Sequence, residues 1–303
     1  MRSIVLMPDA SVVHTDATGI EMSFAVRPTA PVLAGHYPHF PLLPGVFTLD
    51  AVHQAVLRHA DDDLQLSDIR SVRFQSPVLP GDTLTVEAAV KEVDGVRDVR
   101  ATCRTERGRS ATLRLRYTAA AAGPREITAA VPRHHAPAPE VDHGPAALKK
   151  LIPHRYPALL VDRVHAVEPG RSIVTTKAVT CNEPWYQDVP DSAGDAGYAY
   201  PTALLIESWC QSAALLAAWD RPQDELAGQV ALFGGMSGIG LGPEVRPGDL
   251  LRHEVRISRA LEGTWIFEGR TTVDGTAVLA VDSVMTALRP SGALTELTAA
   301  AQG

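Results

Sequence analysis

Two long segments of the chain are strongly apolar, and each carries one acidic residue inside it. Residues 46–59 contain Asp50, and residues 202–219 contain Glu207. Such segments are typical of helices that are buried in a core. The second is the longest apolar stretch, but Glu207 and Gln211 interrupt it, and it falls short of the roughly 20 residues that a membrane span needs. We therefore predict two core helices and no membrane-spanning segment.

A sequence repeat follows each apolar segment. One copy reads VLPGDTLTVEAAV (78–90) and the other EVRPGDLLRHEVRI (244–257), with a leucine two residues and a glutamate five residues after each PGD aspartate. Because proline presets φ and glycine accepts positive φ, PGD predicts a tight turn that opens a long strand. Two further strand-like runs, joined by hairpin-like turns, follow each copy. They cover residues 96–105 and 110–117 in the first half, and residues 264–272 and 276–288 in the second.

One helix followed by antiparallel strands, seen twice, predicts the α+β class with two domains. We place an N-terminal domain at residues 1–120 and a C-terminal domain at residues 145–292, with a tail at 293–303. Residues 121–144 are rich in Ala, Pro and His without a steady period, which is typical of a linker. No acid or cysteine spacing there supports a metal site, so we expect the linker histidines to be solvated. They are His134, His135 and His143.

Motifs in both halves resemble one enzyme family. In the second half, LKKLIPHRYPALLVDRVHAVEPGRSIV (148–174) and NEPWYQ (182–187) are similar to the opening segment of the FabZ/FabA-like 3-hydroxyacyl-ACP dehydratases of bacterial fatty-acid synthesis. In the first half, GHYPHFPLLPGVFTLDAVHQA (35–55) is similar to the active-site motif of that family. His36, Pro44, Gly45 and Asp50 reproduce its spacing. The resemblance implies a double hot-dog fold, in which two antiparallel sheets each wrap a central helix and pack as a pseudo-dimer.

The second half departs from the family pattern where the catalytic histidine is expected. The sequence after NEPWYQ continues with Asp-Val-Pro and an irregular insert, and no histidine occurs between His165 and His253. The Pro-Gly pair is replaced by Pro-Thr, whereas an acid survives as Glu207, followed by Gln211. The family's active site lies between two hot-dog units, so the resemblance implies one complete site, in which His36 meets Glu207. Asp50 would face the region of Val189 as a leftover acid.

The implied reaction removes water from a 3-hydroxyacyl thioester. His36 is the candidate base, because a histidine pKa lies near neutrality. Glu207 is the candidate acid, and we expect burial to raise its pKa so that it keeps a proton for the departing hydroxyl. Gly45 would offer a backbone N–H to the thioester oxygen, and Gln211 would orient the acid. Candidate residues along the acyl chain are Phe40, Pro44 and Val46, and no metal or other cofactor is implied.

Several residues also have a purely structural interpretation. Glu207 could be a buried relic of an ancestral site, and Asp50 a residue that supports packing. His154 and Arg155, in the PHRYP motif, are expected to pin their segment rather than react. A glycine-rich run at residues 235–242 lacks a following helix, so we do not interpret it as a nucleotide-binding loop.

The implied partner is an acyl carrier protein that presents the substrate on its phosphopantetheine arm. The formal net charge of −7 argues against nonspecific nucleic-acid binding, so carrier binding would need a local basic patch. We expect a cytoplasmic protein, monomeric as a pseudo-dimer or a homodimer of it, whose three cysteines are reduced. Candidates for the basic patch are Arg70, Arg73, Lys149, Lys150 and Arg155.

Two other functions fit the same resemblance. A degenerate dehydratase that only binds an acyl carrier, or that supports an active partner subunit, is consistent with the loss of one histidine. A hot-dog thioesterase or an enoyl-CoA hydratase would share the fold but act on another bond or carrier. The sequence does not separate dehydration from hydration, because the reaction is reversible.

Overall fold

The computed structural model describes residues 4–38, 40–60, 63–120, 127, 140–221, 229–261, 263–290 and 292. The first half contains β1 (Ala10–Asp16), β2 (Gly19–Ala25), α1 (Pro31–His36), α2 (Gly45–His59), β3 (Leu64–Phe74), β4 (Thr83–Val93), β5 (Val96–Thr105) and β6 (Gly108–Ala119). The second half contains β7 (Glu140–His143), α3 (Pro145–Leu151), β8 (Arg163–Glu168), β9 (Ser172–Ala178), η2 (Pro184–Tyr186), η3 (Asp195–Tyr198), α4 (Thr202–Ala218), β10 (Gln229–Leu241), β11 (Leu250–Leu261), β12 (Thr264–Val273) and β13 (Thr276–Pro290).

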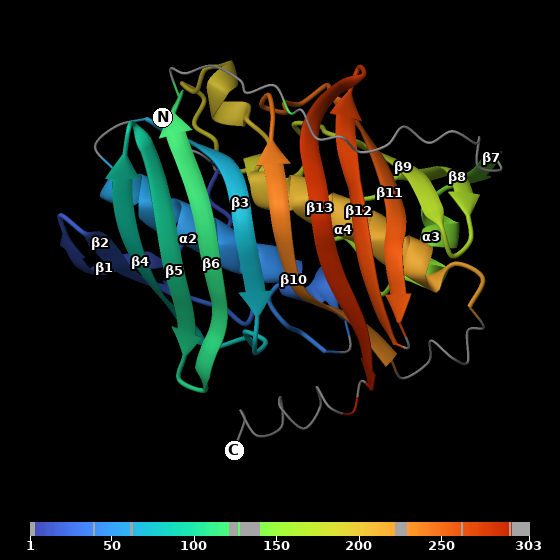
Figure 1. The fold of residues 1–303 in the computed structure, drawn as a ribbon, viewed down its shortest axis with the longest axis horizontal. Helices are drawn as coiled ribbons and strands as arrows, with labels where there is room; N and C mark the ends of the chain where they lie inside the picture. The colour runs from blue at the N-terminus through green and yellow to red at the C-terminus, as the bar shows by residue number, and fades with distance from the viewer. Residues whose placement is uncertain are drawn as a thin grey trace.

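All strands belong to one sheet, in the order β1-β2-β4-β5-β6-β3-β10-β13-β12-β11-β9-β8-β7. The pairs are antiparallel, and the pair β3·β10 joins the two halves of the chain. We expected two separate sheets, so this continuous sheet is a difference from the sequence analysis. Figure 1 shows α2 and α4 side by side on one face of the sheet.

The two long helices form the core together with the inner face of the sheet. Helix α2 contacts β2, β3 and β4, helix α4 contacts β9, β11, β12 and β13, and the two helices contact each other. Nearly every side chain of α4 is buried, and Trp209 is fully buried. Burial on all sides explains why the segment is apolar around its whole circumference rather than along one stripe.

The two PGD turns have the same geometry, which confirms the repeat. Gly81 has φ of 89° and Gly248 has φ of 105°, a region that residues with a Cβ rarely adopt. In each copy the aspartate side chain accepts a hydrogen bond from the backbone N–H three residues earlier. The pairs are Leu79 to Asp82 at 2.7 Å and Arg246 to Asp249 at 2.8 Å.

Residues 235–241 of the glycine-rich run form the C-terminal part of strand β10, at the seam between the halves. A Cβ on Gly235 would lie 2.6 Å from the carbonyl oxygen of Val72 on β3. A side chain at this position would therefore push the two strands apart. The run serves strand pairing between the halves, in agreement with our rejection of a nucleotide-binding loop.

The C-terminal end of the expected linker is part of the sheet. Residues 140–143, which we assigned to the linker, form β7 and pair with β8. There the ring of His143 lies 5.5 Å from the ring of Trp219. Residues 121–126 and 128–139 of the linker, with His134 and His135, and the tail at 293–303 lie outside the described residues.

Two sequence expectations about the whole chain can be compared with the structure. Cys103, Cys181 and Cys210 are unpaired, as expected from their number and spacing. In the described part of the chain, no helix combines the length and the apolar character that crossing a membrane requires.

Candidate active site

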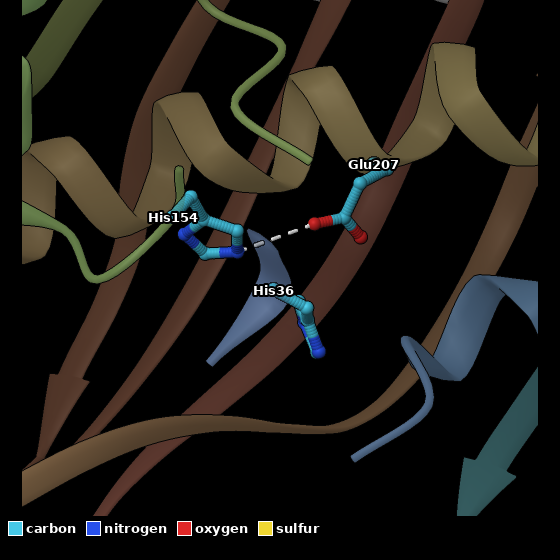
Figure 2. Close-up of side chains that lie close together, drawn as sticks. All are labelled: His36, His154 and Glu207. Atoms are coloured by element: carbon cyan, nitrogen blue, oxygen red, sulfur yellow. Dashed lines mark ion pairs between the residues drawn. The ribbon is translucent and has the colours of Figure 1, made fainter. Parts of the chain in front are cut away.

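One buried cluster brings together His36, His154 and Glu207 (Figure 2). His36 is the last residue of α1, His154 lies in the segment between α3 and β8, and Glu207 lies on α4. One ring nitrogen from each histidine and one carboxylate oxygen of Glu207 lie within 4.8 Å of one another. The three residues are exposed by 7%, 3% and 8%, respectively. The first half of the chain thus contributes an imidazole to a site where the second half contributes a carboxyl and a second imidazole.

The imidazole of His36 is held in one tautomer by the main chain. Its Nδ1 lies 3.1 Å from the carbonyl oxygen of Leu42. A carbonyl oxygen only accepts hydrogen bonds, so Nδ1 carries the proton and Nε2 keeps a lone pair. Burial, together with the nearby charge of His154, lowers the pKa of His36 to about 4, although Glu207 acts in the opposite direction. At neutral pH His36 is therefore an uncharged imidazole that can accept a proton.

The carboxyl of Glu207 is fixed by Gln211, one helical turn later on α4. The Gln211 amide nitrogen donates to Oε1 of Glu207 at 3.0 Å and to the carbonyl oxygen of Ala158 at 2.7 Å. The Gln211 amide oxygen accepts from the backbone N–H of Leu160 at 2.9 Å. With both ends engaged, the Gln211 side chain has little rotational freedom. It connects Glu207 to the segment that follows His154.

The pKa of Glu207 differs in direction from our expectation. Burial does raise it, but hydrogen bonding from His154, the charges of His36 and His154, and the Gln211 amide together lower it below its usual value. From the apolar neighbours along α4 alone we predict a raised pKa, which is wrong. The free site therefore holds Glu207 as a carboxylate at neutral pH.

His154 is the member of the cluster that the sequence analysis placed outside the chemistry. Its Nε2 lies 3.5 Å from Oε1 of Glu207, and its Nδ1 is buried without a hydrogen-bond partner in the described chain. The neighbouring Arg155 does pin the segment, because its guanidinium donates to the carbonyl oxygens of three residues. These are Lys149, Ile152 and His154. The PHRYP motif draws attention to His154, but its numbering gives no indication that His154 contacts Glu207 in the folded chain.

Asp50, the second acid, lies outside the cluster. It is buried in the middle of α2, where the Gln54 amide donates to it at 2.6 Å. Burial raises the pKa of Asp50 to about 7, although hydrogen bonds from Gln54 and from the backbone of Leu6 act in the opposite direction. The pair Asp50–Gln54 repeats the spacing of Glu207–Gln211. The buried cluster of His36, His154 and Glu207 does not include Asp50.

The remaining candidate residues lie around the start of α2. Pro44 is the N-cap and Gly45 the first residue of this helix, and the N–H of a first helical residue has no acceptor within its own helix. Val46 is buried in the main core. Phe40 packs against a smaller cluster that includes Tyr37 and Leu42, which flank His36 and its hydrogen-bond partner.

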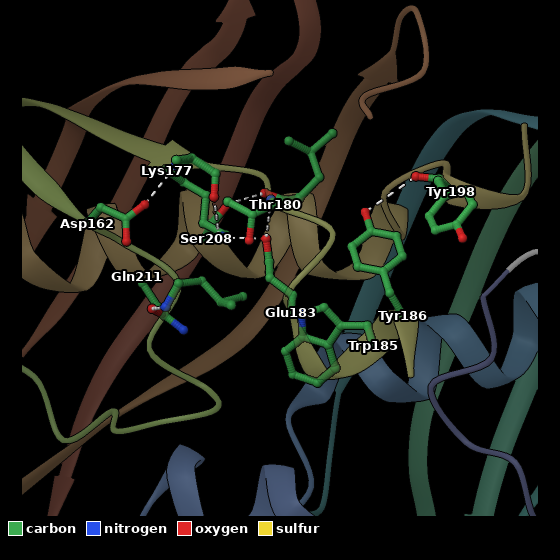
Figure 3. A network of polar contacts seen from close by, with 12 residues as sticks. Asp162, Lys177, Thr180, Glu183, Trp185, Tyr186, Tyr198, Ser208 and Gln211 are labelled. Atoms are coloured by element: carbon green, nitrogen blue, oxygen red, sulfur yellow. Dashed lines mark hydrogen bonds and ion pairs between the residues drawn. The ribbon is translucent and has the colours of Figure 1, made fainter. Parts of the chain in front are cut away.

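The NEPWYQ motif builds a polar network beside α4 (Figure 3). The carboxyl of Glu183 accepts from Lys177 Nζ at 3.0 Å, from the backbone N–H of Thr180 at 3.0 Å and from the indole N–H of Trp185 at 3.0 Å. Lys177 and Glu183 form a nearly buried ion pair. All three of these hydrogen bonds come from the local chain, so the role of Glu183 is structural.

The cluster has the donor set of a possible metal site. Two imidazoles and one carboxylate are ligands that divalent transition ions such as Zn²⁺ use. The Nδ1–H of His36 already donates to the carbonyl oxygen of Leu42, and a metal-bound histidine frequently makes such a hydrogen bond through its other ring nitrogen. The 4.8 Å spread of the three ligand atoms would have to contract for all of them to reach one ion.

A cavity of about 470 Å³ lies elsewhere, around the end of α2 and the β1–β2 turn. It is lined by Asp16, His59, Glu92 and Arg97 among others, and by none of the three cluster residues. The cavity lies apart from the buried cluster, where an imidazole and a carboxyl that are candidates for acid–base chemistry converge.

Comparisons with known proteins match the two halves separately. The family model of the ApeI-like dehydratases matches residues 12–112, and that of the FabA-like domain matches residues 152–282. The 3-hydroxyacyl-[acyl-carrier-protein] dehydratase FabZ of Albidiferax ferrireducens is 43% identical over 141 residues, which cover 45% of this chain and 87% of that protein. One half of the chain thus spans nearly a whole FabZ protein.

Solved structures match the chain over both halves. The dehydratase domain of PpsC from Mycobacterium tuberculosis has a TM-score of 0.64 at 16% identity, covering 95% of this chain and all of that domain. The dehydratase domain from the CurJ module of the curacin polyketide synthase has a TM-score of 0.65 at 13% identity, covering 95% of this chain and 99% of that one. These matches confirm the double hot-dog dehydratase fold. The chain belongs to the FabZ/FabA-like dehydratase family and carries two dehydratase-like halves in one polypeptide.

Proposed function

We propose that this protein removes water from 3-hydroxyacyl thioesters on an acyl carrier protein to give 2-enoyl thioesters, in fatty-acid or polyketide-type biosynthesis. Family membership supports this reaction. The observation that carries it in this chain is the buried cluster, in which an imidazole from the first half lies beside a carboxyl from the second half. Dehydration needs a base and an acid close together.

His36 and Glu207 divide the proton transfers between them. Nε2 of the neutral His36 takes a proton from the α-carbon, and Glu207, protonated in the substrate complex, gives its proton to the departing hydroxyl, which leaves as water. The proton on His36 then returns to Glu207, so the pair regains its starting state. In the hydration direction the Glu207 carboxylate activates water, which suits its low pKa in the free site.

The start of α2 supplies the third element of the reaction. Loss of the α-proton places enolate-like charge on the thioester oxygen, and an N–H at a helix N-terminus stabilises such charge. Gly45 is the first residue of α2, and we assign this role to its backbone N–H. Phe40, Pro44 and Val46 would contact the acyl chain.

The two halves would then act as the covalent counterpart of a dimer, with one working site. The second site would be represented by Asp50, which has a glutamine partner but does not lie in the histidine cluster. A carrier protein as partner, a cytoplasmic location and the absence of a cofactor belong to this proposal. Arg155 is not part of the proposed carrier patch, because its guanidinium is engaged by backbone carbonyls.

The test is mass spectrometry of a 3-hydroxyacyl carrier protein incubated with wild type and three variants. Wild type should remove the mass of one water, His36→Ala should abolish this, and Glu207→Gln should nearly do so. Asp50→Asn should retain most of the turnover. Equal loss in all three variants would contradict the assignment of one composite site.

The same experiment separates the alternative functions. Release of free carrier thiol would identify a thioesterase, and activity on CoA esters alone would identify an enoyl-CoA hydratase. Binding of the carrier without conversion of either 3-hydroxyacyl or 2-enoyl substrate would show a non-catalytic subunit.

A further inference from the structure

We propose that His154 is a positioning residue for Glu207: together with Gln211 it holds one carboxylate oxygen, Oε1, and leaves the other, Oε2, to exchange the proton with the substrate. This inference rests on the proposed function. It assigns a role to a histidine of the second half that we had placed outside the chemistry.

The first observation is that two donors converge on the same oxygen. The Gln211 amide nitrogen lies 3.0 Å and His154 Nε2 lies 3.5 Å from Oε1 of Glu207. In the described part of the chain, no hydrogen bond reaches Oε2, and Figure 2 shows this oxygen turned away from His154. A carboxylate with donors on one oxygen takes up a proton on the other.

The second observation is that His154 has no competing polar partner. Its Nδ1 is buried and unpaired within the described residues, so Nε2 toward Glu207 is its one polar contact. Nε2 is therefore the ring nitrogen of His154 that donates to Glu207. The distance of 3.5 Å is long, and such contacts tighten when substrate binds.

The third observation is that the chain around His154 is anchored at both ends. Arg155 donates to the carbonyl oxygens of Lys149 and Ile152, and Gln211 engages Ala158 and Leu160. The segment that carries His154, one donor to Oε1, therefore also fixes Gln211, the other donor. This double attachment gives the carboxylate a single orientation.

The reaction step follows from this orientation. The hydroxyl of the substrate takes the proton from Oε2 while the C–O bond breaks, and the electron pair of that bond leaves with the water. The α-proton goes to Nε2 of His36. Transfer of that proton from His36 to Oε2 restores the starting state, and His154 neither gains nor loses a proton.

Two variants and a matched control test the role in turnover. His154→Gln keeps an N–H donor, and His154→Phe keeps the size but has none. We expect His154→Phe to lower kcat roughly 100-fold with a smaller effect on KM, as a misplaced catalytic group does. His154→Gln should restore most of kcat. His165→Phe, at a half-buried histidine on β8 that contacts Thr176, is the control for a general loss of folding.

The pH profile separates positioning from packing. The donor at His154 lowers the pKa of Glu207, so its loss should move the basic limb of kcat/KM for dehydration to higher pH. His154→Gln and His165→Phe should leave that limb in place. The proposal would be overturned if kcat fell equally in His154→Gln and His154→Phe and the basic limb of the kcat/KM profile stayed at the same pH in both.

A measurement without substrate keeps the two proposals distinguishable. In protein labelled with ¹³C at the glutamate carboxyls, the Glu207 signal, assigned with Glu207→Gln, should titrate at higher pH in His154→Phe than in wild type. An unchanged titration would refute the role of His154 even in an active enzyme. Absence of turnover in wild type with the expected titration shift would refute the proposed function alone.

Discussion

The amide of Gln54 donates a 2.6 Å hydrogen bond to Asp50 from one helical turn later on α2. Gln211 and Glu207 have the same relationship on α4, with a distance of 3.0 Å. The pKa values of the two acids nevertheless shift in opposite directions. Imidazoles surround Glu207, whereas the other partner of Asp50 is the backbone of Leu6. The environment beyond the helix, rather than the acid–glutamine pair, decides the charge of each carboxyl.

Asp50 should make the stability of the protein depend on pH. Its pKa is about 7 in the folded chain and 3.8 in the unfolded chain, so between these values the folded chain binds a proton that the unfolded chain has released. Stability therefore falls as pH rises through this window, and the loss is complete above pH 7. It amounts to up to ~4 kcal/mol. Asp50→Asn should remove this dependence.

Urea unfolding of wild type and Asp50→Asn at pH 5 and pH 8 checks this prediction. The variant should gain free energy of unfolding relative to wild type on going to pH 8. An identical pH dependence of the two proteins would show that Asp50 is ionised in the folded state.

Gly235→Val should disturb the seam between the halves. Its Cβ would meet the carbonyl oxygen of Val72 at 2.6 Å, which forces β10 away from β3. We expect a loss of about 1–3 kcal/mol in the free energy of unfolding. Turnover should fall further than stability, because His36 and Glu207 come from opposite sides of the seam. Circular dichroism melting and the dehydration assay measure the two effects.

Gly144→Ala is the control for this substitution. A Cβ there meets open space and φ is −92°, so stability and turnover should stay at the wild-type level. Wild-type turnover in a well-folded Gly235→Val protein would show that the seam tolerates displacement.

Lys177→Met should destabilise the second half strongly. It leaves the nearly buried Glu183 without its cation, which costs on the order of 3–5 kcal/mol. The double variant Lys177→Met with Glu183→Gln should recover part of this loss, because no unpaired charge remains. Thermal unfolding of the single and double variants gives the comparison, and equal melting temperatures for all would exclude a buried ion pair.

Metal removal and metal addition should have different effects. Dialysis against EDTA should leave dehydration unchanged, since the proposed mechanism uses no metal. Added Zn²⁺ should inhibit by binding His36, His154 and Glu207, which removes the free lone pair of His36. Inhibition should be weaker in His154→Gln, which lacks one imidazole. Loss of turnover with EDTA that Zn²⁺ restores would show a metal-dependent reaction instead.

The sequence by itself determined the elements of the fold. The predicted helices at 46–59 and 202–219 correspond to α2 (Gly45–His59) and α4 (Thr202–Ala218), and the predicted run at 96–105 coincides with β5 (Val96–Thr105). Hydrophobic pattern and turn residues are local signals, because they reflect burial and backbone φ within a few residues. The family motifs likewise indicate His36 and Glu207.

Only the tertiary structure decided how these elements form a site. Continuity of the sheet depends on the pairing of β3 with β10, which joins distant parts of the chain. The arrival of His154 beside Glu207 depends on the same kind of long-range packing. The pKa of Glu207 follows from it, because the neighbours along α4 alone would raise this pKa and the imidazoles that lower it come from elsewhere. Electrostatic effects in a buried site depend on distances in space, which spacing along a chain does not specify.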